Sequence, residues 1–368
     1  MSGPERERIV SLQILRFVAA MMVVVFHTGN LVDQLAPSDS ALFTRFADIG
    51  PAGVDIFFVL SGFVIAITGP LATPRPSGLL FLWRRWRRVA PVYFVISLPE
   101  VVNAWRAGGL SADRLAATFL FWPVTRTGVT FPYLEPGWTL CFEMVFYFTV
   151  SLLLVGGRLG RNLAIGAAVV AVLVVARLVL AGVALRFLAN PIFLEFAVGV
   201  GLALASRAVM RAPIALGALF LAAGVGAYLA EALIGVGDLG LAARVLEDHG
   251  ALWRVLAFGA PAAAIVAGAL ICERRCGGPL AALLARFGDA SYAIYLTHFA
   301  AINLVGMAWV ALRAPASAPA MIGCALAVAL AIGLVCHRVI ERPILRDLKR
   351  LSVPWPPWRA VPAVEPLT

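Results

Sequence analysis

The 368-residue chain is 61% hydrophobic and only 14% charged, whereas soluble domains carry about 25% charged residues. So few charges cannot cover a soluble surface, and the mean hydropathy of +0.92 also indicates a membrane protein. The net charge of +10 comes almost wholly from arginine, because Lys349 is the one lysine. In a membrane protein this excess indicates cytoplasmic loops rather than a nucleic-acid partner. The surroundings of Lys349 exclude a Walker A loop and ATP-driven pumping by this chain.

Apolar segments close to the ~20 residues that cross a bilayer as a helix follow one another between Pro, Gly and Arg breaks. The sequence predicts an all-α polytopic membrane bundle of about ten spans, in one domain over residues 1–350, followed by a Pro-rich cytoplasmic tail at 351–368. The expected spans are 12–32, 52–69, 87–105, 137–155, 162–181, 188–206, 212–233, 252–272, 289–311 and 318–339. Residues 114–123 are too short to cross and are expected at the interface or re-entering the bundle.

Arginines gather in alternate loops. With a cytoplasmic N-terminus, the inner loops hold Arg75, Arg84, Arg85, Arg87, Arg88, Arg158, Arg161, Arg207, Arg211, Arg274, Arg275, Arg286 and the basic stretch 338–350. The outer loops hold isolated arginines. This asymmetry predicts that both termini are cytoplasmic.

A few ionisable side chains fall inside the expected spans. Each costs about 2.5–3.5 kcal/mol in hydrocarbon, so those present are functional candidates. They are Arg16, His27, Asp55, Glu143, Arg177, Glu195, Glu231 and His298. Glu231 and Arg254 lie near outer span ends and are expected at the interface. The five cysteines show no spacing with histidine that predicts a metal site.

Arg16 and His27 lie eleven residues apart in the first span. At about 100° and 1.5 Å per residue they share one helix face and differ in depth by roughly 16 Å. We therefore expect both to line one cavity. The alternative is that His27 makes an interhelical hydrogen bond and Arg16 extends to the membrane surface.

The positions of these residues along their expected spans place His27 at the same membrane depth as three acidic residues, Asp55, Glu143 and Glu195. A neutral imidazole beside carboxylates can take a proton from a hydroxyl and hold the resulting cation. Asp55 or Glu143 is expected to fix the tautomer of His27.

Residues 81–93 mix four arginines with two tryptophans at the expected inner surface. Such a segment anchors a protein at the membrane surface. Its guanidinium groups also suit phosphates, for which anionic lipid headgroups compete.

Five motifs in order, over roughly residues 12–343, resemble the membrane acyltransferase 3 family. They are Leu12-Gln13-Ile14-Leu15-Arg16 with His27, Gly53-Val54-Asp55-Ile56-Phe57-Phe58-Val59-Leu60-Ser61-Gly62-Phe63, the stretch Arg84 to Tyr93, Gly137-Trp138-Thr139-Leu140-Cys141-Phe142-Glu143-Met144-Val145-Phe146-Tyr147, and Ser291-Tyr292-Ala293-Ile294-Tyr295-Leu296-Thr297-His298. The first and fourth resemble the exopolysaccharide-production branch most. Cys141 departs from the polar residue usual at that motif position.

The resemblance implies an enzyme of the bacterial inner membrane, surrounded by lipid, that moves an acyl group, usually acetyl, from cytosolic acyl-CoA to a carbohydrate hydroxyl near the outer face. It implies a catalytic group of His27 and Arg16, to which our reading adds Asp55 and Glu143. Acyl-CoA is expected at Arg84, Arg85, Arg88 and Tyr93. Substrate contacts are expected from Ser61, Trp138, Tyr147, Tyr292, Tyr295 and His298. Acetyl-CoA is the expected co-substrate, and no metal is expected.

Two alternatives stay open. Intramembrane charges also mark permeation paths, so a transporter or flippase of a lipid-linked glycan is a rival function. Within the enzymatic reading, His27 acts as a general base or accepts the acyl group itself before passing it on.

Overall fold

The computed structural model describes residues 9–36, 41–68, 77–154, 182–235, 237–315 and 317–350. In these ranges the chain is helical, apart from loops and one isolated antiparallel bridge between Val124 and Val129. The expected fifth span with Arg177, the tail at 351–368, and Arg75, Arg158 and Arg161 lie outside the described residues.

Ten longer helices form the bundle. They are α1 (Val10–Leu35), α3 (Ala52–Thr68), α4 (Gly78–Arg106), α6 (Trp138–Leu153), α9 (Phe193–Leu204), α11 (Ile214–Ile234), α14 (Ala260–Cys272), α15 (Gly278–Asp289), α16 (Ser291–Ala311) and α17 (Ala318–Cys336), among the described residues. Shorter helices connect them: α2 (Ala41–Ala47), α5 (Ala112–Leu115), α8 (Val183–Leu188), α10 (Ser206–Arg211), α12 (Ala242–Leu246), α13 (Ala251–Arg254) and α18 (Arg342–Arg350). Three π-helical turns occur at Ala116–Leu120, Val255–Gly259 and His337–Glu341.

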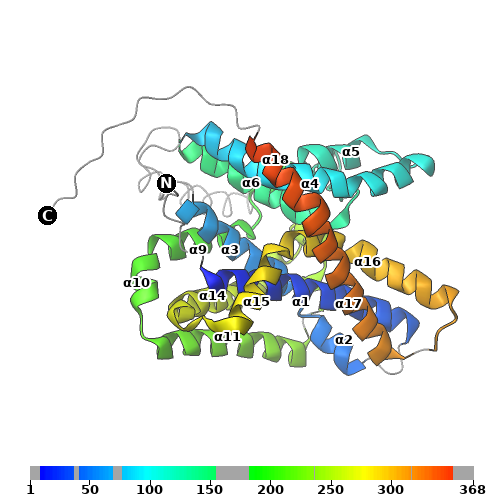
Figure 1. The fold of residues 1–368 in the computed structure, drawn as a ribbon. Helices are drawn as coiled ribbons and strands as arrows, with labels where there is room; N and C mark the ends of the chain where they lie inside the picture. Colours follow the sequence, from blue (N-terminus) through cyan, green and yellow to red (C-terminus); the bar gives the residue numbers. More distant parts are fainter. Residues whose placement is uncertain are drawn as a thin grey trace.

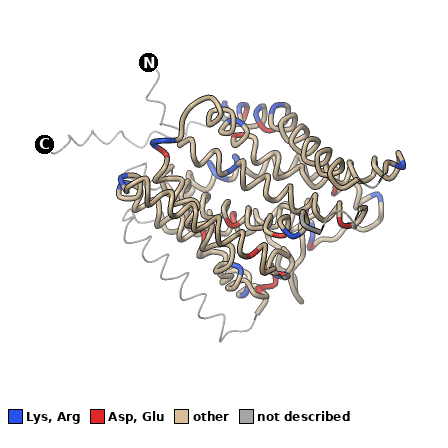
Figure 2. The backbone as a smooth tube through the Cα atoms, turned by 90° about the horizontal axis from the view of Figure 1, so that it is seen from below, with Lys and Arg blue, Asp and Glu red and all other residues tan. Residues whose placement is uncertain are grey.

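Eight helical segments of the described chain are long and apolar enough to cross a membrane. They are Val10–Leu35, Phe43–Thr68, Glu135–Leu153, Val183–Leu204, Ile214–Ile234, Ala251–Arg275, Ser291–Ala311 and Ala318–Leu348. Each overlaps an expected span, and the all-helical, multi-pass architecture is confirmed. Figure 2 shows long stretches of backbone without acidic or basic residues.

The expected third span, 87–105, falls in α4, which begins earlier than predicted and is not among these eight segments. The expected loop arginines Arg84, Arg85, Arg87 and Arg88 are helical, because α4 begins at Gly78 with the Ser77 hydroxyl accepting from the Leu80 amide at 3.4 Å. Arginine is a good helix former. A run of arginines therefore continued the helix where the sequence reading placed a loop.

Helix α1 runs through the middle of the bundle and contacts α2, α3, α14, α15, α16 and α17. In Figure 1, α4 and α6 lie on one side of α1 and α3, and α11 lies on the other. The most extensive pairings are α11 with α14, α3 with α9, and α16 with α17. Arg16 and His27 therefore lie on a central helix of the bundle.

Helices α3 and α9 approach closely at two glycines. A Cβ added to Gly62 would lie 2.1 Å from the Phe196 carbonyl oxygen, and one added to Gly199 would lie 2.1 Å from the Val59 carbonyl oxygen. Small residues allow membrane helices to pack backbone against backbone. This pairing fixes the position of α3, which carries Asp55 and Ser61.

Glu273 caps the start of α1 from a distant part of the chain. Its carboxylate oxygens accept from the amides of Val10 at 2.7 Å and Ser11 at 2.8 Å. An acidic group stabilises a helix N-terminus, where the amides are otherwise unpaired. The cap fixes the end of α1 that carries Arg16.

Candidate active site

One cavity gathers most of the side chains that the motifs singled out. Its cavity volume is about 130 Å³, and the space outside the protein atoms reaches about 950 Å³ when the open solvent at its mouth is included. Its walls come from α1, α3, α4, α6, α16 and the π-helical turn His337–Glu341. The expected site residues that line it are Arg16, Ser61, Arg85, Arg88, Glu143, Tyr147, Tyr292 and Tyr295.

Glu143 is the acceptor of a polar cluster in the cavity wall. Its Oε1 accepts from the Ser61 hydroxyl at 2.8 Å and from the Tyr147 hydroxyl. Ser61 comes from α3, and Glu143 and Tyr147 lie one turn apart on α6, so the cluster joins two helices. The unusual Cys141 is buried and directs its thiol to the carbonyls of Ala117 and Gly137, so it takes no part in this cluster.

Three guanidinium groups make one part of the cavity basic. Arg16 interacts electrostatically with Arg88, Glu341 and Glu143. Arg85 donates to the Thr68 hydroxyl and lies over the Phe81 ring at 5.7 Å. The remaining lining is mainly apolar, from residues such as Phe57, Leu60 and Leu140.

Arg84 is exposed and is not part of this cavity. On α4 it lies one helical turn before Arg88, so these two side chains share one side of the helix, but of the two only Arg88 lines the cavity. The expected arginine group is therefore divided, with Arg85 and Arg88 at the cavity and Arg84 on the surface.

Glu341 lines the cavity and was missed by the sequence reading. It is 6% exposed and pairs with His337, whose Nδ1 lies 2.7 Å from its Oε2. The expected last span ended at 339, so this carboxylate was counted with the basic end of the chain. The sequence did carry a signal for Glu341 as a candidate site residue, because it is an acidic residue that lies among arginines about half a turn beyond the apolar span.

His27 does not line this cavity, which differs from the expectation that it shares one tunnel with Arg16. Its partly buried ring lies 5.0 Å from the His298 ring and 5.3 Å from the Phe299 ring, between ring centroids. Tyr295 lines the cavity, and its ring lies 5.7 Å from that of His298. The rings of Tyr295 and His298 therefore connect the cavity wall with His27.

His298 is completely buried, and its two ring nitrogens differ in their surroundings. Nδ1 lies 2.5 Å from the Tyr295 carbonyl oxygen, while Nε2 has no hydrogen-bond partner in the described structure. Because a carbonyl only accepts, Nδ1 carries the proton and Nε2 of the neutral ring keeps a lone pair. A buried lone pair thus lies in the ring beside His27.

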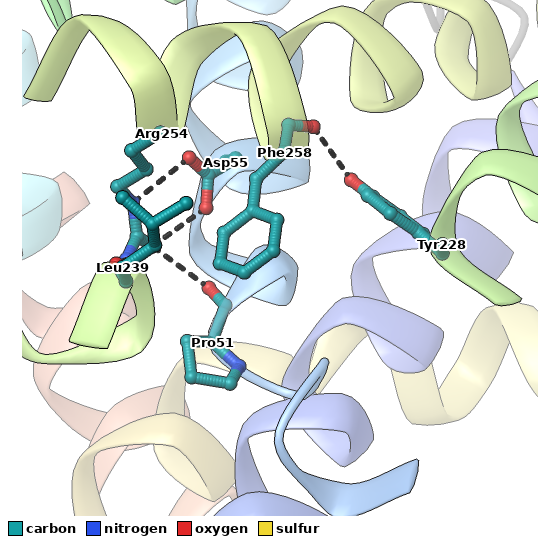
Figure 3. A network of polar contacts seen from close by, with 6 residues as sticks. All are labelled: Pro51, Asp55, Tyr228, Leu239, Arg254 and Phe258. Carbon is teal, nitrogen blue, oxygen red and sulfur yellow. Dashed lines mark hydrogen bonds and ion pairs between the residues drawn. The ribbon is translucent and has the colours of Figure 1, made fainter. Parts of the chain in front are cut away.

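Asp55 does not serve His27, because Arg254 holds both of its oxygens (Figure 3). Arg254 Nε lies 3.1 Å from Oδ1 of Asp55, and a terminal nitrogen lies 2.6 Å from Oδ2. The guanidinium also donates to the carbonyls of Pro51 at 3.1 Å and Leu239 at 2.8 Å. Arg254 is 1% exposed, so its expected interfacial position is wrong: the charge is buried because a carboxylate and two carbonyls surround it.

Glu195 belongs to the same buried network. It is 2% exposed, interacts electrostatically with Asp55 and Arg254, and lies against Gly259, where an added Cβ would be 2.6 Å from its Oε1. The expected single layer of His27 with three acids is therefore divided into three groups. Asp55 and Glu195 surround Arg254, Glu143 lies in the cavity, and His27 pairs with His298.

Tyr93 and Trp138 are core residues. Tyr93 is fully buried, with its ring 5.5 Å from that of Phe121, and its hydroxyl has no hydrogen-bond partner in the described structure. Trp138 is 6% exposed and packs edge-on against Phe58 and Phe142. Neither lines the cavity, and the expected contacts of Tyr93 with acyl-CoA and of Trp138 with substrate stay predictions.

Residues 9–338 match the acyltransferase 3 family model, which describes an acyltransferase domain. The chain belongs to the acyltransferase 3 family. The match covers the whole cavity except Glu341 and includes every motif on which the resemblance was based. The protein is therefore a multi-pass membrane acyltransferase.

Two characterised proteins are similar to this member of the family. The exopolysaccharide production protein ExoZ of Rhizobium meliloti (strain 1021) is 32% identical over 306 residues, which are 81% of this chain and 90% of ExoZ. The acyltransferase MdmB of Streptomyces mycarofaciens is 29% identical over 158 residues, 40% of each chain. The expected resemblance to the exopolysaccharide branch is confirmed. No solved structure matches the chain.

Proposed function

We propose that this acyltransferase moves an acetyl group from cytosolic acetyl-CoA to a hydroxyl of a carbohydrate at the outer side of the bacterial inner membrane, with both chain termini in the cytoplasm. The observation that carries the proposal is the lining of the basic cavity. The same cavity is lined by Arg16, Arg85 and Arg88 and by Tyr295, whose ring contacts that of His298 in the histidine pair.

The proposed binding of the acyl donor, acetyl-CoA, is supported by the charge and the apolar lining of the cavity. Guanidinium groups bind phosphates with charge-assisted hydrogen bonds, so Arg85, Arg88 and Arg16 suit the diphosphate of acetyl-CoA. The apolar wall at Phe57, Leu60 and Leu140 suits the uncharged arm that carries the thioester. Arg84, on the surface of the same helix, is left to contact anionic lipid headgroups.

His27 is the proposed general base. It takes the proton of the acceptor hydroxyl as the hydroxyl oxygen attacks the thioester carbonyl. The C–O bond forms, the C–S bond breaks, and the proton is returned to the departing CoA sulfur. General base catalysis typically contributes about 10² to 10⁴ in rate.

A movement of Tyr295 is part of this proposal. In the structure its hydroxyl lies 3.1 Å from the Thr139 hydroxyl and donates to the Pro136 carbonyl at 3.1 Å. The ring must turn from this position for a thioester in the cavity to reach His27. Conformational steps that open or close an active site, mostly by loops and lids, are common in enzymes.

The carbohydrate acceptor is supported by the name of the relative ExoZ, which is a protein of exopolysaccharide production. The test uses the purified full-length protein in detergent with acetyl-CoA and a sugar acceptor. Release of CoA thiol with equal formation of acetylated sugar is the expected result. A transporter or flippase needs no thioester, so a folded protein that leaves acetyl-CoA intact would contradict the proposal.

A further inference from the structure

A second pocket lies on the other side of the histidine pair. Its cavity volume is about 300 Å³, at the lower end of the range of about 300–1,000 Å³ for small-molecule sites. Its polar and aromatic lining comes from α4, α5, the loop before α6, and α16, and includes Glu100, Arg114, Tyr133, Glu135, Phe299 and Asn303.

Helix α16 connects the basic cavity with this second pocket. Tyr292 and Tyr295 line the cavity, and Phe299 and Asn303 line the pocket. At about 100° and 1.5 Å per residue, these four residues fall within an arc of roughly 80° and extend over roughly 16 Å. One face of α16 therefore leads from the cavity to the pocket.

Two further elements also contribute residues to both spaces, at different positions along their length. On α4, Arg88 lines the cavity and Glu100, twelve residues later, lines the pocket, a rise of roughly 18 Å. Glu135 lines the pocket directly before α6, and Glu143, inside α6, lines the cavity. The two spaces thus lie at different depths of the same helices.

His27 lies between the two spaces. Its ring contacts His298, which contacts Tyr295 of the cavity, and it meets Phe299 of the pocket edge-on at 5.3 Å. A molecule in the second pocket is therefore separated from the imidazole by one aromatic side chain.

The pocket's cation already has partners. Arg114 Nε donates to the Phe131 carbonyl and a terminal nitrogen to the Pro132 carbonyl, both at 3.3 Å, and the guanidinium lies 4.4 Å from the Tyr133 ring centroid. Its main role is to hold the loop. The Tyr133 hydroxyl also has partners, since it accepts from the Ser111 amide at 2.6 Å and donates to the Gly109 carbonyl at 3.2 Å. The remaining polar side chains that line the pocket are the carboxylates Glu100 and Glu135 and the amide of Asn303.

We propose that this pocket binds the sugar ring of the acceptor and selects a ring without negative charge. Carboxylate and amide oxygens accept hydrogen bonds from sugar hydroxyls, and Phe299 offers an apolar contact for the ring carbons. An acidic sugar is disfavoured because its carboxylate would meet the carboxylates of Glu100 and Glu135 against the single positive charge of Arg114, and a surplus of like charge opposes binding. The inference deepens the proposed function and rests on it.

The test is direct binding to the full-length protein in detergent, measured by saturation-transfer NMR with methyl glucoside, methyl galactoside and the matching uronic acid glycosides. The neutral glycosides are expected to bind at least about 10-fold more tightly than the acidic ones, a conservative value for like-charge repulsion. In the double variant Glu100→Gln, Glu135→Gln, this preference should disappear because the repelling charges are gone. Glu231→Gln, on α11 and outside the pocket, is the matched control and should retain the preference.

Equal binding of neutral and acidic sugars to the wild-type protein, an unchanged preference in the double variant, or no sugar binding at all would overturn the inference. CoA thiol release is measured on the same samples. Charge-dependent sugar binding without thiol release would contradict the proposed function alone. Thiol release with acetylated sugar but without charge-dependent binding would contradict the pocket assignment alone.

Discussion

The ring centroids of His27 and His298 lie 5.0 Å apart, with the ring planes inclined by 39°. One histidine comes from α1 and the other from α16, which are in direct contact. His298 directs its Nδ1 to a backbone carbonyl, so the orientation of its ring is fixed from within its own helix. This fixed ring forms one side of the site of His27.

His298→Gln is expected to lower kcat by about 10-fold or more, though less than the ~10² to 10⁴ that removal of a general base costs. The reason is that His27 loses the ring against which it is positioned. Steady-state acetyl transfer by the purified variant measures the effect, and the KM for acetyl-CoA should stay the same. His249→Gln, at a side chain 64% exposed, is the control. Equal kcat in the two variants would remove His298 from the site.

The Glu143 cluster should act on donor binding. Ser61→Ala and Tyr147→Phe each remove one hydrogen bond to the Glu143 carboxylate, and bonds to charged groups are worth about 1.5–3 kcal/mol. Each variant should therefore raise the KM for acetyl-CoA, by about 10-fold for a loss of 1.4 kcal/mol. With Glu143→Gln in the background, the two effects should shrink, because the shared acceptor has lost its charge. Fully additive effects would show that the three residues act independently.

The ion pair of Asp55 and Arg254 should affect the stability of the folded protein, and the loss of one partner should lower it. Arg254→Met alone leaves a buried carboxylate unpaired, which typically costs about 3–5 kcal/mol. The double variant Asp55→Leu, Arg254→Met removes both charges and should recover most of that loss, since well-packed apolar replacements of buried pairs are often neutral. Thermal unfolding in detergent compares the three proteins. A double variant less stable than the single one would contradict this account.

Two glycines on α9 make a matched comparison. Gly199→Leu forces a side chain into the α3 backbone, whereas Gly201, two residues later, has open space around its Cα. Gly199→Leu should reduce the yield of folded protein sharply, and Gly201→Leu should leave it near the wild-type level. Size-exclusion chromatography in detergent measures both. Similar yields would show that α3 and α9 tolerate separation.

The sequence predicted the membrane class, the helical architecture and most span positions, because hydrophobic segments of membrane length are a local signal. It also placed Arg16 correctly at the basic cavity. The partner of Asp55 could not be predicted, since Arg254 is 199 residues away and the pairing depends on which helices meet. Depth alone put Asp55 with His27, but depth does not specify the direction in which a side chain points.

The sequence also could not predict that Arg16 and His27 belong to different parts of the site. Helical periodicity gave them one face of α1, yet Arg16 lines the cavity whereas the ring of His27 contacts His298, a residue of α16. Because α16 packs against α1 here, the structure has a cavity and a separate histidine pair where a single tunnel was expected. Glu341 was missed for a simpler reason, because the expected span ended two residues too early.

The most direct test of the account is acetyl transfer from acetyl-CoA to a sugar acceptor by purified His27→Ala, compared with His249→Ala. The account predicts a loss of about 10² or more in kcat for His27→Ala, with unfolding temperature and acetyl-CoA binding as in the wild-type protein, and unchanged transfer for His249→Ala. Transfer by folded His27→Ala at the wild-type rate would contradict the assignment of His27 as the base.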